Sequence, residues 1–156
     1  MKAAIFSSLA EKVIGARVLD LFAGAGGLGI EAMSRGAASA VFVESNRNAA
    51  RAIEHNLAIA GVDGHVRARD VFAYLKYATG PFDIIFADPP YETAPGAKAF
   101  TDLLLNNPRI PFLLAPDAVF ILEKRPGEKL PEHLQWKVVR ARRYGATEVI
   151  FAERQR

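Results

Sequence analysis

The sequence predicts an α/β fold: a mostly parallel seven-stranded sheet with helices on both faces and an antiparallel hairpin at its C-terminal end. Short, nearly continuous apolar runs alternate with longer amphipathic segments, which is typical of buried parallel strands joined by crossover helices. Two strand-forming segments close the chain and are separated only by Gly145 and Ala146, which indicates the hairpin. A length of 156 residues, 51% of them hydrophobic and 24% charged, suits one folded domain and excludes a disordered chain.

The predicted elements follow one another without a linker, so we expect residues 1–156 to form a single domain. Strands are expected at residues 17–22, 40–44, 66–69, 82–87 and 119–123, and the hairpin strands at residues 136–144 and 147–152. Helices are expected at residues 28–35, 48–60, 71–77 and 97–105. The helix at 48–60 has the clearest pattern, because Ala49, Ile53 and Leu57 recur at helical spacing and Gly61 follows as a stop signal.

The chain contains no cysteine, which excludes a disulfide scaffold, a thiolate nucleophile and a zinc site built on sulfur. Its three histidines are scattered, without carboxylates at metal-ligand spacing, so we expect no metal. No apolar run approaches the roughly 18 residues of a membrane helix, and the N-terminal segment is too short for a signal peptide. We therefore expect a soluble, cytoplasmic monomer that does not associate with membranes.

The positive charge of the chain is concentrated near its C-terminus. Residues 1–123 carry 11 basic and 13 acidic side chains, whereas residues 124–156 carry 9 basic and 4 acidic ones, within an overall net charge of +3. A basic stretch suits a partner that bears phosphates. The candidates for such contacts are Lys124, Arg125, Arg140, Arg142 and Arg143. The alternative is a solvated edge strand whose charges prevent aggregation.

A glycine-rich loop at residues 20–29 connects the first predicted strand to the first helix. Gly24, Gly26 and Gly29 have the spacing of the dinucleotide-binding fingerprint. Glycines at these positions allow a tight turn and let backbone N–H groups approach a ligand that a side chain would block. The loop therefore indicates a nucleotide-like ligand, and a strand-to-helix turn without a ligand is the alternative.

Three carboxylates follow successive strands of the predicted sheet and narrow the choice of ligand. Glu44 closes the second strand, where it would meet the ribose diol of either NAD or S-adenosylmethionine. Asp20 would repel a pyrophosphate but suits an ammonium group, which S-adenosylmethionine carries together with its sulfonium. Asp70 can accept from an adenine amine, or it can cap the helix that follows. Together the three acids favour S-adenosylmethionine over NAD as the cofactor.

The tetrapeptide Asp88-Pro89-Pro90-Tyr91 directly follows the fourth predicted strand, at the edge where open α/β sheets bind ligands. Its two prolines hold the backbone extended, so the Asp88 carboxylate and a neighbouring carbonyl form a rigid pair of acceptors beside the Tyr91 ring. A planar base that stacks on this ring can donate its exocyclic amine to both acceptors, which positions the nitrogen for methylation. A proline turn with Asp88 as a cap is the alternative.

With these motifs the sequence resembles class I S-adenosylmethionine-dependent methyltransferases. The resemblance rests on Asp-x-Phe-Ala-Gly-x-Gly at residues 20–26, Gly-Ile-Glu-Ala-Met-Ser-Arg-Gly-Ala at 29–37 and Asp-Pro-Pro-Tyr at 88–91. With residues 4–9 and 143–145, the chain is similar more narrowly to the bacterial family that methylates guanine N2 in small-subunit (16S) ribosomal RNA. This resemblance implies a Rossmann-like class I methyltransferase fold, S-adenosyl-L-methionine as cofactor, and ribosomal RNA or the small ribosomal subunit as partner.

The resemblance also implies roles for individual residues. Asp20 would orient the amino group of the cofactor, Glu44 its ribose and Asp70 its adenine. The full set of implied cofactor-binding residues is Asp20, Phe22, Ala23, Gly24, Gly26, Gly29, Glu44, Ser45, Asn46, Asp70 and Val71. The implied catalytic residues, which would hold a guanine flipped out of its helix, are Asp88, Pro89, Pro90 and Tyr91.

Members of this family usually begin with an additional basic segment containing Arg-Pro-Thr, which we expect to be absent here, since Met1 stands at the helix expected over residues 2–12. Other functions stay open at this point. One is an adenine-N6 or other amino-methyltransferase that acts on DNA, RNA or protein through the same tetrapeptide. The others are an NAD-dependent oxidoreductase and an RNA-binding module without catalysis.

Overall fold

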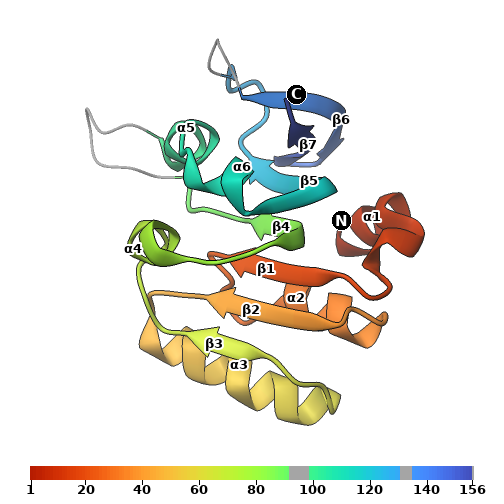
Figure 1. Ribbon diagram of the computed structural model, residues 1–156, viewed down its shortest axis with the longest axis vertical. Coiled ribbons are helices and arrows are strands. Elements are labelled where there is room, and N and C mark those ends of the chain that lie inside the picture. The colour runs from red at the N-terminus through yellow and green to blue at the C-terminus, as the bar shows by residue number, and fades with distance from the viewer. Residues whose placement is uncertain (92–98, 131–134, 156) are drawn as a thin grey trace.

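The computed structural model describes residues 1–91, 99–130 and 135–155. These residues form a seven-stranded sheet (Figure 1). Its strands are Arg17–Leu21 (β1), Ser39–Val43 (β2), His65–Arg67 (β3), Phe82–Ala87 (β4), Leu114–Lys124 (β5), Trp136–Tyr144 (β6) and Thr147–Arg154 (β7). Across the sheet the order is β3-β2-β1-β4-β5-β7-β6.

The direction of the strands shows where a ligand would bind. Strands β1 to β5 pair in parallel, whereas β7 lies antiparallel between β5 and β6. The chain moves outward from β1 to β2 and β3, then crosses back to place β4 on the other side of β1. Open α/β sheets bind ligands where the strand order reverses, outside the carboxyl ends of the strands. In this sheet that position lies at the ends of β1 and β4.

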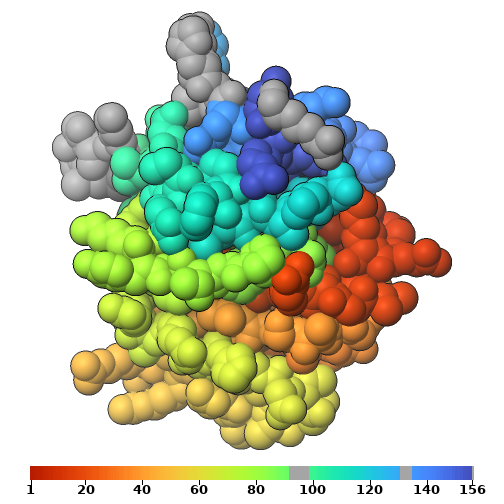
Figure 2. All heavy atoms as spheres, in the orientation of Figure 1, coloured from red at the N-terminus to blue at the C-terminus, as the bar shows by residue number. Residues whose placement is uncertain are grey.

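Helices cover both faces of the sheet (Figure 1). One face carries α1 (Lys2–Leu9), the short 3-10 helix η1 (Ala10–Val13), α2 (Gly27–Ser34) and α3 (Arg47–Ala60). The opposite face carries α4 (Val71–Tyr77), α5 (Phe100–Leu105) and α6 (Arg109–Leu113). In Figure 2 the segments around α4 and α6, green to teal, form a closely packed surface, and α1, in red, lies at its margin.

Two hydrophobic cores flank the sheet, because alternate side chains of a strand point to opposite faces. In β1, Leu19 and Leu21 belong to the core under α4 to α6, while Val18 belongs to the core under α1 to α3. Burying one such side chain completely stabilises the fold by about 1.5–3 kcal/mol. The position of a residue along a central strand therefore decides which face of the sheet it occupies.

The predicted parallel sheet and its antiparallel C-terminal hairpin are confirmed. The predicted bounds agree with the observed ones to within two residues, except in two places. Strand β5 begins at Leu114, five residues before its predicted start, because Pro116 reads as a turn residue in the sequence. Helix α5 begins at Phe100, and residues 97 and 98 of the predicted helix lie outside the described residues.

The sequence did not predict α6, and it predicted one longer helix where α1 ends at Leu9 and η1 continues to Val13. Two prolines, Pro108 and Pro111, suggest a turn at α6. A helix tolerates proline in its first turn, because the N–H groups there have no partner within the helix. Among the described helices, none has the length and apolarity needed to cross a membrane.

A glycine in the first turn of α2 sets the distance between this helix and β2. A Cβ atom at Gly29 would lie 2.3 Å from Cε1 of Phe42, whereas a Cβ atom at Gly27 would meet no atom within 4 Å. We expect Gly29→Ala to lower the free energy of unfolding by about 1–3 kcal/mol, because the buried Phe42 ring has little room to move. Gly27→Ala, in the same helix, should keep it unchanged or raise it by about 0.5 kcal/mol. Urea unfolding checks this, and equal stabilities of the two variants would contradict it.

Candidate active site

Three carboxyl side chains meet at the carboxyl end of the sheet, on the face covered by α1 and α2. Asp20 comes from β1, Asp88 directly follows β4, and Glu123 lies near the end of β5. Each stands two residues after a side chain that belongs to the core of this face, so strand alternation points all three the same way. Together they line one cavity of about 220 Å³.

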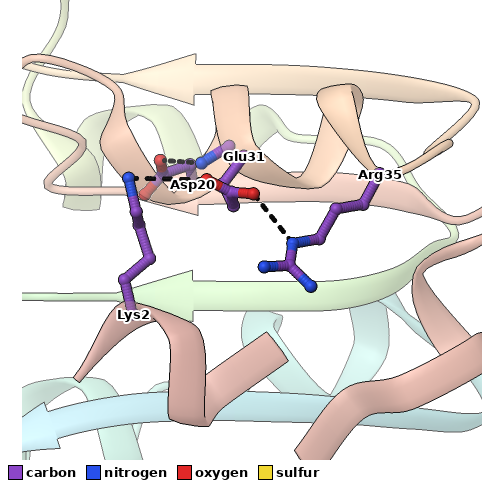
Figure 3. A network of polar contacts seen from close by, with 5 residues as sticks. Lys2, Asp20, Glu31 and Arg35 are labelled. Atoms are coloured by element: carbon purple, nitrogen blue, oxygen red, sulfur yellow. Dashed lines mark hydrogen bonds and ion pairs between the residues drawn. The ribbon is translucent and has the colours of Figure 1, made fainter. Parts of the chain in front are cut away.

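The glycine loop and α1 complete the wall of this cavity. The other lining residues are Met1, Lys2, Phe22, Ala23, Gly27 and Leu28. Figure 3 shows how α1 is held over α2: Lys2 Nζ lies 3.5 Å from Glu31 Oε1, and Arg35 Nε donates to Glu31 Oε2 at 2.8 Å. The Arg35 guanidinium also lies 5.0 Å from the centre of the Phe6 ring on α1. These contacts keep the start of α1 beside the carboxyl groups.

The carboxyl groups in the cavity hold their protons more tightly than usual. Burial raises the pKa of Asp20 to about 8, although the Gly29 N–H, which donates to Asp20 Oδ2 at 3.0 Å, acts in the opposite direction. Burial also raises the pKa of Glu123, and the neighbouring Asp88 charge adds to this effect. Asp88 is exposed to solvent when the whole residue is considered. The surrounding protein nevertheless removes part of the water around its side-chain carboxyl group, and this raises the pKa of Asp88 as well. A cationic ligand would relieve this crowding of negative groups.

A larger hollow of about 420 Å³ lies at the other end of β5, lined by residues 115–118, Glu153 and Arg154. It is remote from the glycine loop and from the carboxyl ends of the parallel strands. We therefore place the active site at the smaller cavity, where the topology and the charged groups coincide.

Glu44, at the end of β2, holds the glycine loop in place. Its Oε1 accepts the N–H of Gly24 at 2.8 Å, and its Oε2 accepts the N–H of Asn46 at 2.9 Å. Gly24 and Gly26 have φ angles of 59° and 88°, a region that favours glycine and that the tight turn requires. Each carboxylate oxygen has a second lone pair, so Glu44 can also accept from the hydroxyls of a ribose.

Two of the predicted cofactor residues serve as helix caps. Asp70 Oδ2 accepts the N–H of Ala73 at 3.0 Å and caps α4, which confirms the capping alternative for this residue. Asn46 caps α3 by accepting the N–H of Ala49 at 2.9 Å. Val71 is buried at the start of α4, whereas Ser45 is exposed after β2. Capping uses one lone pair of the Asp70 carboxylate and leaves others for a ligand.

An aromatic cluster lies between the glycine loop and α4. The Phe22 ring centre is 6.2 Å from that of Phe72 and 5.5 Å from that of Phe100. Phe72 and Phe100 stack at 6.1 Å with an interplanar angle of 16°. The sequence suggested Phe22 as a site residue, but the involvement of Phe100 depends on the placement of α5, which no local pattern indicates.

The tetrapeptide at residues 88–91 is tied to the hairpin through its tyrosine. The Tyr91 hydroxyl makes hydrogen bonds of 2.9 Å to Thr147 Oγ1 and 3.2 Å to the Lys124 carbonyl oxygen. The Arg125 guanidinium lies 5.5 Å from the centre of the Tyr91 ring. Pro89 is buried and Pro90 is exposed. The structure thus brings Asp88, Tyr91 and Arg125 together beside the cavity.

The predicted phosphate contact of Lys124 is wrong. Lys124 is only 2% exposed, because it lies in β5 inside the sheet rather than in the polar connection that follows. Its Nζ donates to the carbonyl oxygens of Arg125 and Glu128 at 3.0 and 2.8 Å and lies 2.7 Å from Glu148 Oε1. The Lys124 ammonium therefore holds the start of the next loop and is not available to a phosphate.

The three predicted arginines of β6 are exposed but do not share a face. Arg140 and Arg142 stand opposite Phe151 and Val149, which belong to the core on the cavity side of the sheet. Arg143 stands opposite Glu148 on the other face. Arg140 Nη1 also donates to Ser8 Oγ on α1 at 2.9 Å. The side chains of Arg140 and Arg142 therefore lie on the same face of the sheet as the candidate site, and that of Arg143 does not.

Sequence reasoning missed Glu123, which is 2% exposed and faces Asp20 and Asp88. One signal could have identified it: a charged residue closes an otherwise apolar strand at the same sheet edge as the other two acids. The contributions of Met1 and Lys2 depend on the packing of α1 and had no signal in the sequence.

The strand order with an inserted antiparallel β7, the glycine loop after β1 and the carboxyl-lined cavity define a class I S-adenosylmethionine-dependent methyltransferase. The chain belongs to the family described as "Conserved hypothetical protein 95", whose model matches residues 1–153. The alternatives of an NAD-dependent oxidoreductase and of a module without catalysis are therefore wrong.

Three known proteins illustrate these similarities. The chain is 33% identical over 162 residues to the "Putative rRNA methyltransferase YlbH" of Bacillus subtilis (strain 168), covering 99% of this chain and 85% of that protein. It is 36% identical over 88 residues to "Ribosomal RNA small subunit methyltransferase D" of Escherichia coli (strain K12), covering 56% of this chain and 44% of that protein. It also resembles the solved T. thermophilus 16S rRNA N2 methyltransferase RsmC in complex with AdoMet and guanosine, with a TM-score of 0.76 and 25% identity over 97% of this chain and 41% of that one.

The raised pKa of Asp20 makes the stability of the fold depend on pH. Its folded-state pKa of about 8 exceeds the ordinary value of 3.8, so this group contributes stability that is present below about pH 4 and lost as the pH rises toward 8. Asp20→Asn keeps an oxygen that can accept from Gly29 but cannot ionise. We expect the variant to have a higher Tm than the wild type at pH 8, with the difference shrinking toward pH 4. Calorimetry across this range checks this, and a pH-independent difference would contradict it.

Proposed function

We propose that this protein transfers a methyl group from S-adenosyl-L-methionine to the exocyclic N2 amine of a guanine in small-subunit ribosomal RNA. The observation that carries the proposal is the tetrapeptide at residues 88–91 beside a cavity lined by Asp20 and Glu123. Membership of the family supports this substrate. So do the names of two relatives, which describe a putative rRNA methyltransferase and a small-subunit ribosomal RNA methyltransferase.

The carboxyl groups that line the cavity fit the positive charges of S-adenosylmethionine. Its ammonium and sulfonium groups are cationic, and the carboxyl of Asp20 would face this part of the molecule. Glu44 would accept from the ribose hydroxyls with the lone pairs that Gly24 and Asn46 leave free. Asp70 would accept from the adenine amine while it caps α4. The glycine loop would approach the cofactor through its backbone, and Phe22, Ala23, Ser45 and Val71 would border it.

In this reaction the protein supplies position rather than a strong base. The lone pair of the guanine nitrogen forms a bond to the methyl carbon, the carbon–sulfur bond breaks, and its electron pair stays on sulfur. The nitrogen then loses a proton to a neighbouring acceptor or to water. Asp88 and the backbone held by Pro89 and Pro90 would accept from the amine, and the Tyr91 ring would stack on the base. A base within a helix must first be flipped out, at a cost of a few kcal/mol.

The basic residues on the cavity side are suited to hold the RNA backbone. Arg125 lies over Tyr91, and Arg140 and Arg142 extend along the same face of the edge strand. Exposed guanidinium groups donate two parallel hydrogen bonds to a phosphate, and their binding releases counterions from the nucleic acid. We therefore infer that RNA approaches across β6, β7 and β5 toward Asp88.

Adenine N6 is the second candidate, since the same four residues can hold either exocyclic amine. The T. thermophilus neighbour, which is described as an N2 methyltransferase in complex with guanosine, favours guanine.

The direct test uses small ribosomal subunits that lack methylation. Incubated with the protein and S-adenosylmethionine, they should acquire N2-methylguanine, identified by mass spectrometry of the digested RNA. Naked ribosomal RNA and DNA serve as alternative substrates. Methylation of adenine would replace guanine as the target, and the absence of transfer to any ribosomal RNA would contradict the proposal.

Two aspartates give a matched pair of variants for this experiment: Asp88, directly after β4, and Asp83, inside β4. We expect Asp88→Ala to lower kcat by about 100-fold, because the amine loses its acceptor, while S-adenosylhomocysteine still binds. Asp83, near the other end of the same strand, is hydrogen-bonded to Arg17 instead. Asp83→Ala should therefore leave kcat unchanged. Equal losses in both variants would indicate a general disturbance of β4.

The opposite orientations of Arg142 and Arg143 allow a test of the docking face. The logarithm of RNA affinity should fall with the logarithm of salt concentration, and Arg142→Gln should reduce this slope by about 0.7–0.9, the value for one lost phosphate contact. Arg143→Gln removes the same charge from the other face and should leave the slope unchanged. Filter binding or fluorescence anisotropy over a range of salt concentrations measures both. A larger effect at Arg143 would place the RNA on the face of β6 away from the cavity and would contradict the proposed docking face.

A further inference from the structure

Glu123 has a direct partner in the residue that would accept from the target amine. Strands β4 and β5 are parallel neighbours in which Ala87 stands opposite Leu122, so Asp88 and Glu123 form the next pair along the sheet. Both carboxyl groups line the same cavity. Burial raises the pKa of each, and beyond burial their interaction raises the pKa of Glu123 and lowers that of Asp88, as expected if Glu123 donates a hydrogen bond to Asp88. In the proposed reaction Asp88 accepts from the target amine, and Glu123 has no role of its own.

A hydrogen bond between two carboxyl groups requires that one of them be protonated. Glu123 is 2% exposed, whereas Asp88 is exposed to solvent, so water stabilises the charge on Asp88 better than the charge on Glu123. The proton therefore belongs on Glu123. One oxygen of Asp88 then accepts from Glu123, and the carboxylate cannot rotate freely about its Cβ–Cγ bond.

We propose that Glu123 is a positioning residue of the methyl transfer: its protonated carboxyl holds one oxygen of Asp88 and leaves the other directed at the target amine. The proposal rests on the proposed function, since it assigns Asp88 to the amine. Glu123 does not touch the substrate in this arrangement and acts only through Asp88.

The charged groups around Glu123 decide how this device responds to pH. From β4 it faces Asp88, from β1 Asp20, and from the start of α1 the amino group of Met1, with Lys2 also lining the cavity. Its neighbour on β7 is the uncharged Val149. Burial and Asp88 raise the pKa of Glu123, whereas the Met1 amino group lowers it. Loss of the Glu123 proton at alkaline pH would place a second negative charge beside Asp88 and end the hydrogen bond.

Two substitutions separate positioning from structural support. Glu123→Gln keeps a donor for Asp88 without a titratable group, so kcat should stay within about threefold of the wild type. Glu123→Ala removes the donor and should lower kcat at least about tenfold, with a smaller change in the KM for S-adenosylmethionine. The wild type should lose kcat at alkaline pH, and the Glu123→Gln variant should not show this loss.

Ile121 provides the control, since it lies on the same strand and the same face, two residues before Glu123. Ile121→Val removes one methylene group from the core and should lower Tm while it keeps the alkaline fall of the wild type. Equal losses of kcat in the Gln and Ala variants would overturn the proposal. So would an alkaline fall in Glu123→Gln that matches the wild type.

A measurement without RNA distinguishes a failure of this proposal from a failure of the proposed function. Infrared spectra of the wild type minus those of Glu123→Gln at neutral pH should contain the carbonyl stretch of a protonated carboxyl. This band should be lost as the pH rises. Its absence from the difference spectrum would overturn the pairing of Glu123 with Asp88, whatever the substrate. If the band is present but no ribosomal RNA is methylated, the proposed function fails while the protonated pair stands.

Discussion

The hydrogen bond between the Gly29 N–H and the Asp20 carboxylate is the constraint on which the candidate site depends. It joins the end of β1 to the first turn of α2 across 3.0 Å, inside the protein. The chain between them must turn back sharply, and the positive φ angles of Phe22, Gly24 and Gly26 make this possible. Glu44 then holds the outer part of the same turn through Gly24. The shape of the cavity wall follows from these contacts.

The same carboxyl group opposes folding at neutral pH, because its raised pKa makes the folded chain take up a proton that the unfolded chain has lost. Asp20 lies in a cavity with Asp88 and Glu123, and no ion pair with a cation accompanies it among the described residues. Burial of such groups costs free energy that the two hydrophobic cores must offset. Sites that bind charged ligands often carry such a cost, because ionisable groups buried to meet the ligand lack its opposite charge in its absence. The cavity therefore exchanges some stability for affinity toward a cation.

The antiparallel direction of β7 connects this cavity to the basic edge of the sheet. Because β7 runs against β5, its first residue, Thr147, lies at the carboxyl end of the parallel strands and reaches the Tyr91 hydroxyl. A parallel β7 would place Thr147 at the other end of the sheet. The hairpin also brings β6 to the same edge, where the Arg142 side chain lies on the face of the sheet that carries the cavity. One reversal of direction thus supports the tetrapeptide and orients the basic strand beside it.

By itself the sequence determined the order of the strands along the chain, the helices α2 to α5, the glycine loop and the tetrapeptide at residues 88–91, because apolar periodicity, glycine and proline act locally. It could not determine which side chains from distant strands meet. Glu123 joins Asp88 through the register of β4 and β5, and Lys124 is buried because it takes the opposite face of the same strand. A register shift between Val138 and Arg140 then decides which arginines of β6 share the cavity face. Only the tertiary structure specifies these pairings, since strand adjacency, register and bulges arise from packing over the whole sheet.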